Sequence, residues 1–262
     1  PRAGAPQVSG SLVYGLHAVQ AVLGRRPKDV LRLSIAAARD DARMRELRAL
    51  AARQGVKPVV AAAEALDAET GGAAHQGVVA EVRPSAPLDE NSLLDLLTAR
   101  TEPALVLVLD GVSDPHNLGA CLRTADAAGA TAVVAPRDRA ASLTPAVRKV
   151  AAGAAETIPF AQVTNLARAL RDFKRAGLWI GGAASDGEKS VFDADLTGPL
   201  ALVMGSEGRG LRRLTRENCD FTLRLPMQGT VASLNVSVAA GIALYEAVRQ
   251  RRAKVAKSQQ LR

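Results

Sequence analysis

The sequence predicts an α/β fold in which helices cover both faces of a mostly parallel sheet. Three observations support this prediction. From residue 104 onward, short apolar runs alternate with longer segments of helical spacing, as they do in parallel α/β proteins. Residues 104–109 are apolar without interruption, as a strand buried on both faces requires. Residues 10–83 show the alternation on a smaller scale, so the 262-residue chain is expected to contain a small and a large domain.

The small α/β domain is expected to cover residues 10–83. Residues 30–35 alternate like a strand, and residues 42–53 have helical spacing, with arginines opposite the apolar face. Residues 57–60 and 78–82 are further strand candidates.

A linker is expected over residues 84–103. Two prolines bracket a polar turn at its start, and residues 88–100 look like a helix that leads into the second domain. The large domain should then cover residues 104–252. A polar, basic tail over residues 253–262 is expected to fray.

Within the large domain, strands and helices are expected to alternate. Its strands are predicted at residues 104–109, 131–135, 178–180, 200–204 and 221–225. Its helices are predicted at residues 117–128, 145–152, 164–176 and 234–252. Sheets of this kind bind ligands beyond the carboxyl ends of their strands, so the segments that follow the strands are the first candidates for a site.

Composition narrows the class of partner. A formal net charge of +8 and a pI of about 10.1 favour a polyanionic partner. Only 3% of the residues are aromatic, so a platform that stacks bases is not expected. If RNA is the partner, contacts should go mostly to phosphate, ribose and shape. The candidates on charge alone are Arg25, Arg26, Arg32, Arg43, Arg212, Arg213 and Arg216.

Cysteine and histidine usage argues against a disulfide framework or a metal site. Cys121 and Cys219 are far apart and form no CxxC pattern. The histidines are widely separated: His17, His75 and His116. No apolar run approaches the roughly 20 residues that span a bilayer. A cytoplasmic protein without a membrane partner is therefore expected.

The first candidate site segment is residues 110–123, which follows a buried strand and opens a helix. Asn117 has the residue type of a helix cap, which would explain it without any further role. Arg123, one and a half turns later, would then be a solvated side chain. Against this, Gly119 and Ala120 are small enough to let another backbone approach closely.

The second segment, residues 202–210, places three glycines after a strand: Gly205, Gly208 and Gly210. Their spacing is GxxGxG, which is neither the dinucleotide GxGxxG nor a phosphate loop ending in GK[ST]. A loop of this kind can approach a ligand closely. Glu207 lies among these glycines and is either an exposed loop acid or a functional carboxylate.

The third segment, residues 225–237, leaves a strand, turns at Gly229 and enters the last helix. Ser233 is expected to cap this helix. Capping does not also require Asn235, which is therefore a candidate functional residue. An apolar stripe on the helix is expected to pack on the sheet or, as an alternative, to form an interface; it consists of Val238, Ile242, Tyr245 and Val248.

In this order and at strand ends, the three segments resemble the signature motifs of the SpoU (TrmH) family of S-adenosyl-L-methionine-dependent RNA 2′-O-ribose methyltransferases. The resemblance covers residues 104–252. It implies a SPOUT domain with a deep trefoil knot that holds the cofactor in a bent shape. It also implies a homodimer with the active site at the interface. Knots are rare among protein folds, so this expectation comes from the resemblance alone.

The resemblance also assigns roles to residues. The implied catalytic residues are Asn117, Arg123, Glu207, Ser233 and Asn235. The implied cofactor contacts are backbone groups of Gly205, Leu225 and Leu234. Within the family the arginine is regarded as a base that acts from the partner subunit. Because a guanidinium keeps its proton at ordinary pH, we expect Arg123 to bind the adjacent phosphate and stabilise developing alkoxide charge, with Glu207 and Asn117 orienting it and the ribose.

Two short segments of the small domain carry a second resemblance. Residues 14–19 and 75–78 resemble the substrate-binding domain of the 23S rRNA guanosine 2′-O-methyltransferase branch, a domain like ribosomal protein L30e. The leading expectation is therefore methylation of a 23S rRNA guanosine, on RNA or on an assembling large subunit. The alternatives are the same chemistry on tRNA or another rRNA site, and a non-catalytic ribosome-assembly factor. A dehydrogenase is disfavoured by the missing GxGxxG.

Overall fold

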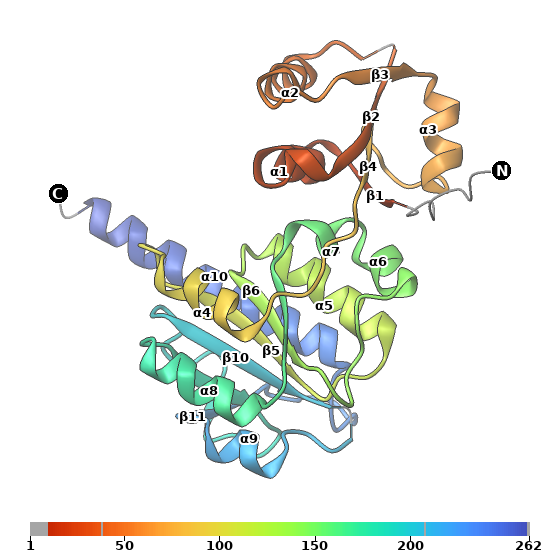
Figure 1. Ribbon diagram of the computed structural model, residues 1–262. Coiled ribbons are helices and arrows are strands. Elements are labelled where there is room, and N and C mark those ends of the chain that lie inside the picture. Colours follow the sequence, from red (N-terminus) through yellow and green to blue (C-terminus); the bar gives the residue numbers. More distant parts are fainter. Residues whose placement is uncertain (1–9, 38, 207, 261–262) are drawn as a thin grey trace. The chain divides into compact units, whose positions relative to one another are not determined.

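The structure is a computed structural model that describes residues 10–37, 39–206 and 208–260, and these form two compact units (Figure 1). Unit 1 contains the chain up to Ser85 together with residues 152–157. Unit 2 contains residues 86–151 and the chain from Ile158 onward.

Unit 1 is a four-stranded sheet in the order β1-β4-β2-β3. Strands β2 and β3 pair in parallel and the other pairs are antiparallel. The strands are β1 (Ser11–Tyr14), β2 (Val30–Ala36), β3 (Pro58–Ala61) and β4 (Val78–Val82). The helices are α1 (Leu16–Arg25), α2 (Ala42–Arg53) and α3 (Ala63–Thr70), with a 3-10 turn at Pro27–Asp29. Neither β1 nor α3 was among the predicted elements.

The helices of unit 1 cover the two faces of its sheet unequally. Val19 and Leu23 of α1 and Met44 and Leu47 of α2 are buried in one large apolar core. Helix α3 contributes Leu66 to a smaller cluster. The amphipathic spacing predicted for α2 is therefore confirmed.

A segment from the middle of the chain completes unit 1. Helix α7 (Ala154–Thr157) carries Glu156, whose side chain is only 2% exposed. Its carboxylate accepts a hydrogen bond from the Ser85 backbone nitrogen at 2.7 Å and pairs with Arg26 at 3.2 Å. The predicted helix over residues 145–152 ends one residue early, because the chain turns at Ala152 and Gly153, whose φ angles are 51° and 92°.

Unit 2 is built on a seven-stranded sheet in the order β7-β6-β5-β10-β8-β11-β9. All of its strand pairs are parallel, which confirms the predicted parallel sheet. The strands are β5 (Leu105–Asp110), β6 (Ala132–Pro136), β7 (Phe160–Val163), β8 (Trp179–Ala183), β9 (Lys189–Ser190), β10 (Leu200–Gly205) and β11 (Phe221–Arg224). β7 and β9 were not predicted.

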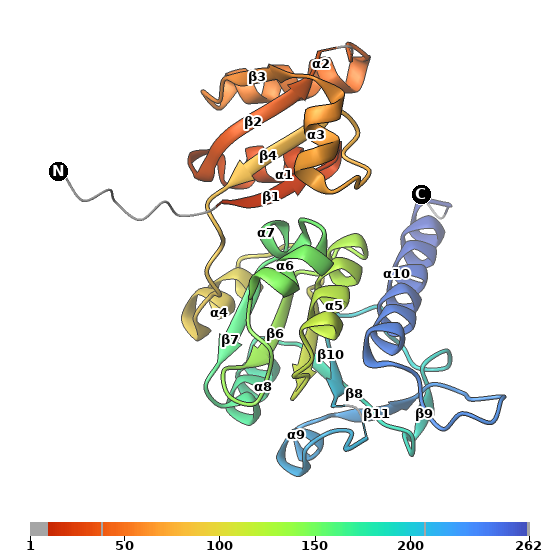
Figure 2. The same cartoon turned by 90° about the vertical axis from the view of Figure 1, so that its right-hand side faces the viewer.

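Helices lie on both faces of this sheet, as predicted (Figure 2). α4 and α8 cover one face, and α5 and α10 lie on the other. The helices are α4 (Glu90–Thr98), α5 (Pro115–Ala127), α6 (Pro145–Ala151), α8 (Leu166–Arg175), α9 (Arg213–Glu217) and α10 (Val236–Gln260). None of the helices within the described residues is both long and apolar enough to cross a bilayer.

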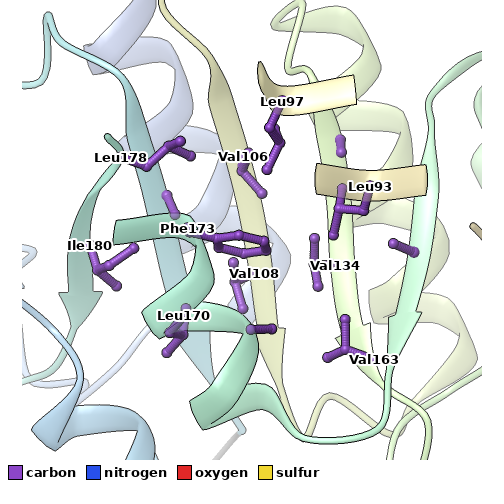
Figure 3. Close-up of a cluster of buried hydrophobic side chains, with 14 of the residues drawn as sticks. Leu93, Leu97, Val106, Val108, Val134, Val163, Leu170, Phe173, Leu178 and Ile180 are labelled. Atoms are coloured by element: carbon purple, nitrogen blue, oxygen red, sulfur yellow. The ribbon is translucent and has the colours of Figure 1, made fainter. Parts of the chain in front are cut away.

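The core beneath α4 and α8 is formed by large aliphatic side chains around one aromatic ring (Figure 3). Phe173 of α8 lies beside Val106 and Val108 of β5. Leu93 and Leu97 of α4 are buried in the same cluster. Although α4 lies in the segment expected to be a linker, its apolar face is therefore part of the core of unit 2.

Two expectations about the last helix were wrong. α10 continues to Gln260, where the sequence predicted a frayed tail. Val238 and Tyr245 of the predicted sheet-facing stripe are each 50% exposed. Alanines make up much of the buried face instead, because α10 packs closely on its neighbours: a Cβ on Gly241 would lie 3.4 Å from the Thr124 methyl group of α5. The buried residues include Ala240, Ala243, Leu244 and Ala247.

Candidate active site

The first two site segments leave the sheet at neighbouring points. Strands β5 and β10 are paired in register, so that Asp110 at the end of β5 lies opposite Gly205 at the end of β10. Both positions are at the carboxyl edge of a parallel sheet, where α/β proteins bind ligands. The third segment follows β11, which reaches the same edge through β8.

Asn117 is buried in the first turn of α5 and does not cap it. The cap is Asp114, whose side chain accepts a hydrogen bond from the His116 backbone nitrogen at 3.1 Å. Asn117 is 8% exposed, and its Oδ1 accepts a hydrogen bond of 2.8 Å from Nδ2 of Asn235. The capping interpretation of Asn117 is therefore wrong, and two residues 118 positions apart are joined across the site.

Asn235 also organises the start of α10. Its Oδ1 accepts hydrogen bonds from the Ser237 nitrogen at 2.9 Å and from the Ser237 hydroxyl at 2.6 Å. Asn235 therefore supplies the capping interaction that was predicted for Ser233, and that prediction was wrong. Ser233 is exposed and has no hydrogen-bond partner within the described chain.

Arg123 is not brought to the asparagine pair. It lies six residues after Asn117 on α5, which is about 9 Å along the helix axis at the usual rise per residue. Its side chain is exposed and has no ion-pair or hydrogen-bond partner among residues 10–37, 39–206 and 208–260. Glu207, the predicted carboxylate of the second segment, lies outside the described residues.

The glycine-rich segment folds tightly on itself. Ser206 and Gly210 exchange backbone hydrogen bonds of 3.2 and 2.9 Å. A Cβ on Gly205 would lie 2.2 Å from the Gly210 carbonyl carbon, so no other residue fits there without a shift of the backbone. Gly208 and Gly210 have φ angles of 77° and 64°, which favour glycine. These glycines are therefore explained by the closure of the loop, whatever ligand it meets.

Asp110 is a site residue to which the sequence interpretation gave no role. It is fully buried at the end of β5 and accepts hydrogen bonds from the Arg212 backbone nitrogen, at 2.8 Å, and from Arg212 Nε. This pair fixes the end of the glycine-rich loop to the centre of the sheet. A carboxylate that directly follows a continuous apolar run was the signal that could have identified it.

The two thiols are unsuited to nucleophilic chemistry. Burial raises the pKa of Cys121 to about 12 and that of Cys219 to about 11, so both stay protonated at neutral pH. In the part of the chain that the structure describes, no three histidine, cysteine or acidic side chains are placed to bind a metal ion.

Backbone groups after β11 suit the expected cofactor contacts. The backbone of residues 225–234 makes no hydrogen bond to another part of the described chain, so the peptide groups of Leu225 and Leu234 can bind a ligand. Leu225 also borders a small apolar cavity beside Met204 of β10 and Ala243 of α10. The site therefore offers both backbone hydrogen bonds and an apolar wall to a cofactor.

The two short segments of unit 1 are in direct contact. Gln76 Oε1 accepts a hydrogen bond of 3.0 Å from the Leu16 nitrogen at the start of α1. His75 accepts from the Gly77 nitrogen at 3.1 Å through Nδ1, and its Nε2 lies 3.0 Å from Asp67 Oδ1. Because Nδ1 accepts, the proton is on Nε2 and is donated to Asp67. His75 is therefore engaged within unit 1, whereas His17 is exposed.

Both units match known families. The SpoU rRNA Methylase family matches residues 104–245. A family described as RNA 2'-O ribose methyltransferase substrate binding matches residues 12–88. These matches confirm the two resemblances that the motifs carry.

Similar proteins cover nearly the whole chain. The 23S rRNA (guanosine-2'-O-)-methyltransferase RlmB of Pseudomonas putida is 56% identical over 92% of this chain and 97% of its own length. The protein of that name from Escherichia coli is 50% identical over 92% and 98%. The solved structure of the SpoU methyltransferase AviRb from Streptomyces viridochromogenes, in complex with AdoMet, superposes with a TM-score of 0.65, at 28% identity over 92% of this chain and 90% of that one. This chain belongs to the SpoU rRNA methylase family.

Proposed function

We propose that this protein transfers a methyl group from S-adenosyl-L-methionine to the ribose 2′-hydroxyl of a guanosine in 23S rRNA. The observation that carries the proposal is the hydrogen bond between Asn117 and Asn235, which unites the first and third motifs at the carboxyl edge of the sheet. The reaction and the substrate are taken from relatives called 23S rRNA (guanosine-2'-O-)-methyltransferase. These relatives are 50–56% identical to this chain over more than nine tenths of its length.

The chain itself must align the hydroxyl and stabilise the charge that develops on its oxygen. Bound S-adenosyl-L-methionine supplies the methyl group. Asn235 is held by Ser237 and in turn orients the Asn117 amide, so the pair is pre-organised before RNA arrives. Ser233, two residues before Asn235, is exposed at the same edge and can reach the ribose. Leu225 and Leu234 offer backbone groups to the cofactor, and Leu225 borders the cavity lined by Met204, the residue before Gly205.

Arg123 is assigned to charge stabilisation and not to proton removal. A guanidinium stays protonated at ordinary pH and offers a planar fork of donors to a phosphate. We propose that Arg123 binds the phosphate next to the target ribose and stabilises the developing alkoxide, with Glu207 and Asn117 orienting it. Its exposed side chain, about 9 Å along α5 from Asn117, is suited to the site of a partner subunit.

A homodimer is part of this proposal. Val238 and Tyr245 are each half exposed on α10, and Ile242 lies between them at helical spacing. An exposed apolar stripe of this kind can pack on the same stripe of a second copy, as two-fold symmetric dimers require.

Val238→Asp is expected to convert the protein to monomers in light-scattering measurements and to abolish methyl transfer, because Arg123 would lose its place in the partner site. A monomeric wild type would contradict the shared-site assignment.

We further propose that unit 1 binds the RNA and that the protein acts in the cytoplasm, where its rRNA substrate is made. The test is to incubate the protein with methyl-labelled S-adenosyl-L-methionine and RNA that lacks the modification, either free or in precursor subunits, and to map the 2′-O-methyl mark. A mark on one 23S guanosine is expected. A mark on tRNA would overturn the substrate, and no mark despite cofactor binding would favour an assembly factor.

Arg123→Lys should lose most activity, because lysine lacks the planar fork.

A further inference from the structure

Most arginines that charge alone nominates for RNA binding are occupied within the protein. Arg26 pairs with Asp29 and Glu156, and Arg212 pairs with Asp110. Four others form ion pairs or donate to a backbone carbonyl: Arg25, Arg32, Arg213 and Arg216. Arg43 is the exception and has no partner in the described parts of the chain. Side chains that are free to bind phosphate must therefore be identified by position and pairing.

Arg139 lies in a loop that is fixed beside the candidate active site. The loop follows β6 and is attached to two neighbouring segments by backbone hydrogen bonds. The Arg137 nitrogen donates to the Val163 oxygen at 2.8 Å, and the Ala141 nitrogen donates to the Val112 oxygen at 2.9 Å. Between these two attachments, the Arg139 backbone approaches Gly111 of the first motif, which itself lies beside Ser206 of the second. The position of a Cβ on Gly111 lies 4.0 Å from the Arg139 carbonyl oxygen and 3.8 Å from Ser206 Cβ.

The backbone of Arg139 is unusual for its residue type. Its φ angle of 58° lies in the left-handed region, which costs a non-glycine residue free energy and often marks a functional position. The side chain is exposed and has no hydrogen-bond or ion-pair partner among the residues described. The neighbouring Asp138 is exposed as well and does not pair with it.

We propose that Arg139 binds a phosphate of the RNA strand beside the target nucleotide. The inference rests on the proposed function and adds to it a residue that sets the register of the RNA on the carboxyl edge. A guanidinium recognises phosphate through two parallel hydrogen bonds. Because the loop is attached on both sides of Arg139, little backbone freedom is lost on binding, which favours affinity.

The test uses the left-handed backbone to separate structure from binding. Arg139→Gly removes the side chain but suits a φ of 58°, so the melting temperature should be unchanged or slightly higher. RNA affinity should fall roughly tenfold at low salt, and the slope of log K against log salt should become shallower by about 0.7–0.9, as expected for one lost phosphate contact. The KM for RNA should rise more than kcat falls, and Arg139→Lys should recover part of the affinity.

Arg175→Ala is the matched control. Arg175 ends α8, just before β8 begins at the opposite edge of the sheet, and its side chain is 77% exposed. This variant loses the same charge and should leave the affinity and the salt slope nearly unchanged. Equal effects of Arg139→Gly and Arg175→Ala would overturn the inference, because net charge would then explain both.

The two proposals fail in different ways. RNA binding is measured without turnover, so a wild type that binds RNA and methylates nothing would end the proposed function while the binding comparison still decides the role of Arg139. A wild type that methylates 23S rRNA, with an Arg139→Gly variant that binds and reacts like it, would overturn the Arg139 inference alone. A wild type that binds no RNA would overturn both.

Discussion

The side-chain nitrogen Nδ2 of Asn235 donates a 2.8 Å hydrogen bond to the side-chain oxygen Oδ1 of Asn117. This bond joins the first turn of α5 to the residue that precedes α10. Further along the two helices, Gly241 lies close to Thr124, so the helices remain in contact beyond the asparagine pair. The geometry of the site therefore depends on how these two helices pack, and a change at either asparagine should affect both stability and catalysis.

A double-mutant cycle tests this relationship. Asn117→Ala and Asn235→Ala should each lower the free energy of unfolding by about 1–2 kcal/mol, because each removes the hydrogen bond that joins α5 to the start of α10. Combined, they should lose about 1 kcal/mol less than the sum, since they share one bond. Methyl transfer should fall by a factor on the order of 10² or more in each. Urea unfolding and initial rates give both quantities.

Asn165 provides a matched control for this cycle. It caps α8 by accepting a hydrogen bond from the Arg168 nitrogen at 3.1 Å, and it follows β7, the edge strand that lies two strands away from β5. Asn165→Ala should cost about 1 kcal/mol of stability, as for other lost caps, with kcat unchanged. If the losses of unfolding free energy in Asn117→Ala and Asn235→Ala add fully, the two side chains are not coupled. If Asn165→Ala reduces kcat as much as these two variants do, the asparagine pair has no special role in catalysis.

Gly205→Ala should abolish cofactor binding. The new methyl group would lie 2.2 Å from the Gly210 carbonyl carbon, so the backbone of the closed loop must move. Gly198→Ala is the control, because Gly198 precedes β10 at the opposite edge of the sheet, a Cβ there meets nothing within 4 Å, and its φ angle is not positive. Calorimetric titration with S-adenosyl-L-methionine should show no binding for the first variant and near wild-type affinity for the second. Equal affinities would show that loop closure does not shape the cofactor site.

The pairing of Asp110 with Arg212 predicts a rescue. Arg212→Ala leaves a fully buried carboxylate with only a backbone donor, and it should lower the free energy of unfolding by about 2–3 kcal/mol. Adding Asp110→Asn removes the buried charge and should recover part of that loss. Urea unfolding of the single and double variants measures the effect. A double variant less stable than Arg212→Ala would mean that Asp110 is stabilised by something other than the arginine.

The sequence identified the large domain because its signals are local: apolar runs for the strands, and motifs placed directly after them. It could not decide which of several capping residues is used. Asp114 and Asn117 are both good caps, as are Ser233 and Asn235, and only the contact between α5 and α10 assigns the asparagines to each other. The exposed stripe of α10 was misplaced for a similar reason, since close packing on α5 selects small side chains. The trefoil knot and the domain boundaries stay predictions.

The two cysteines should be unreactive in the folded protein. Burial raises the pKa of Cys121 to about 12 and that of Cys219 to about 11, so the thiolate population is negligible at pH 8. A colorimetric disulfide reagent should therefore label neither residue under native conditions and both in denaturant. Rapid labelling of the native protein would show that one thiol becomes accessible through local opening, and mass spectrometry would identify which.

Glu246 should make stability depend on pH. Its side chain is 6% exposed and accepts hydrogen bonds from Arg249 at 2.7 and 2.8 Å and from Gln250 at 2.8 Å. Gln250 in turn bonds the backbone of Ala194 and Leu196, so the cluster attaches α10 to that segment. The Arg249 guanidinium holds the pKa of Glu246 below its ordinary value of 4.5.

Because the folded pKa is below the unfolded one, the ionised carboxylate contributes stability that is fully present above about pH 5.5 and is lost as the pH falls through the folded pKa. The difference in unfolding free energy between the wild type and Glu246→Gln should therefore be constant from pH 7 to about 5.5 and shrink below it. Urea unfolding at stepped pH measures this difference. Glu217→Gln is the control, because Glu217 is 51% exposed in its pair with Arg213, and such surface pairs contribute little. A difference for Glu246 that grows in acid would reverse the sign and exclude the assigned cause.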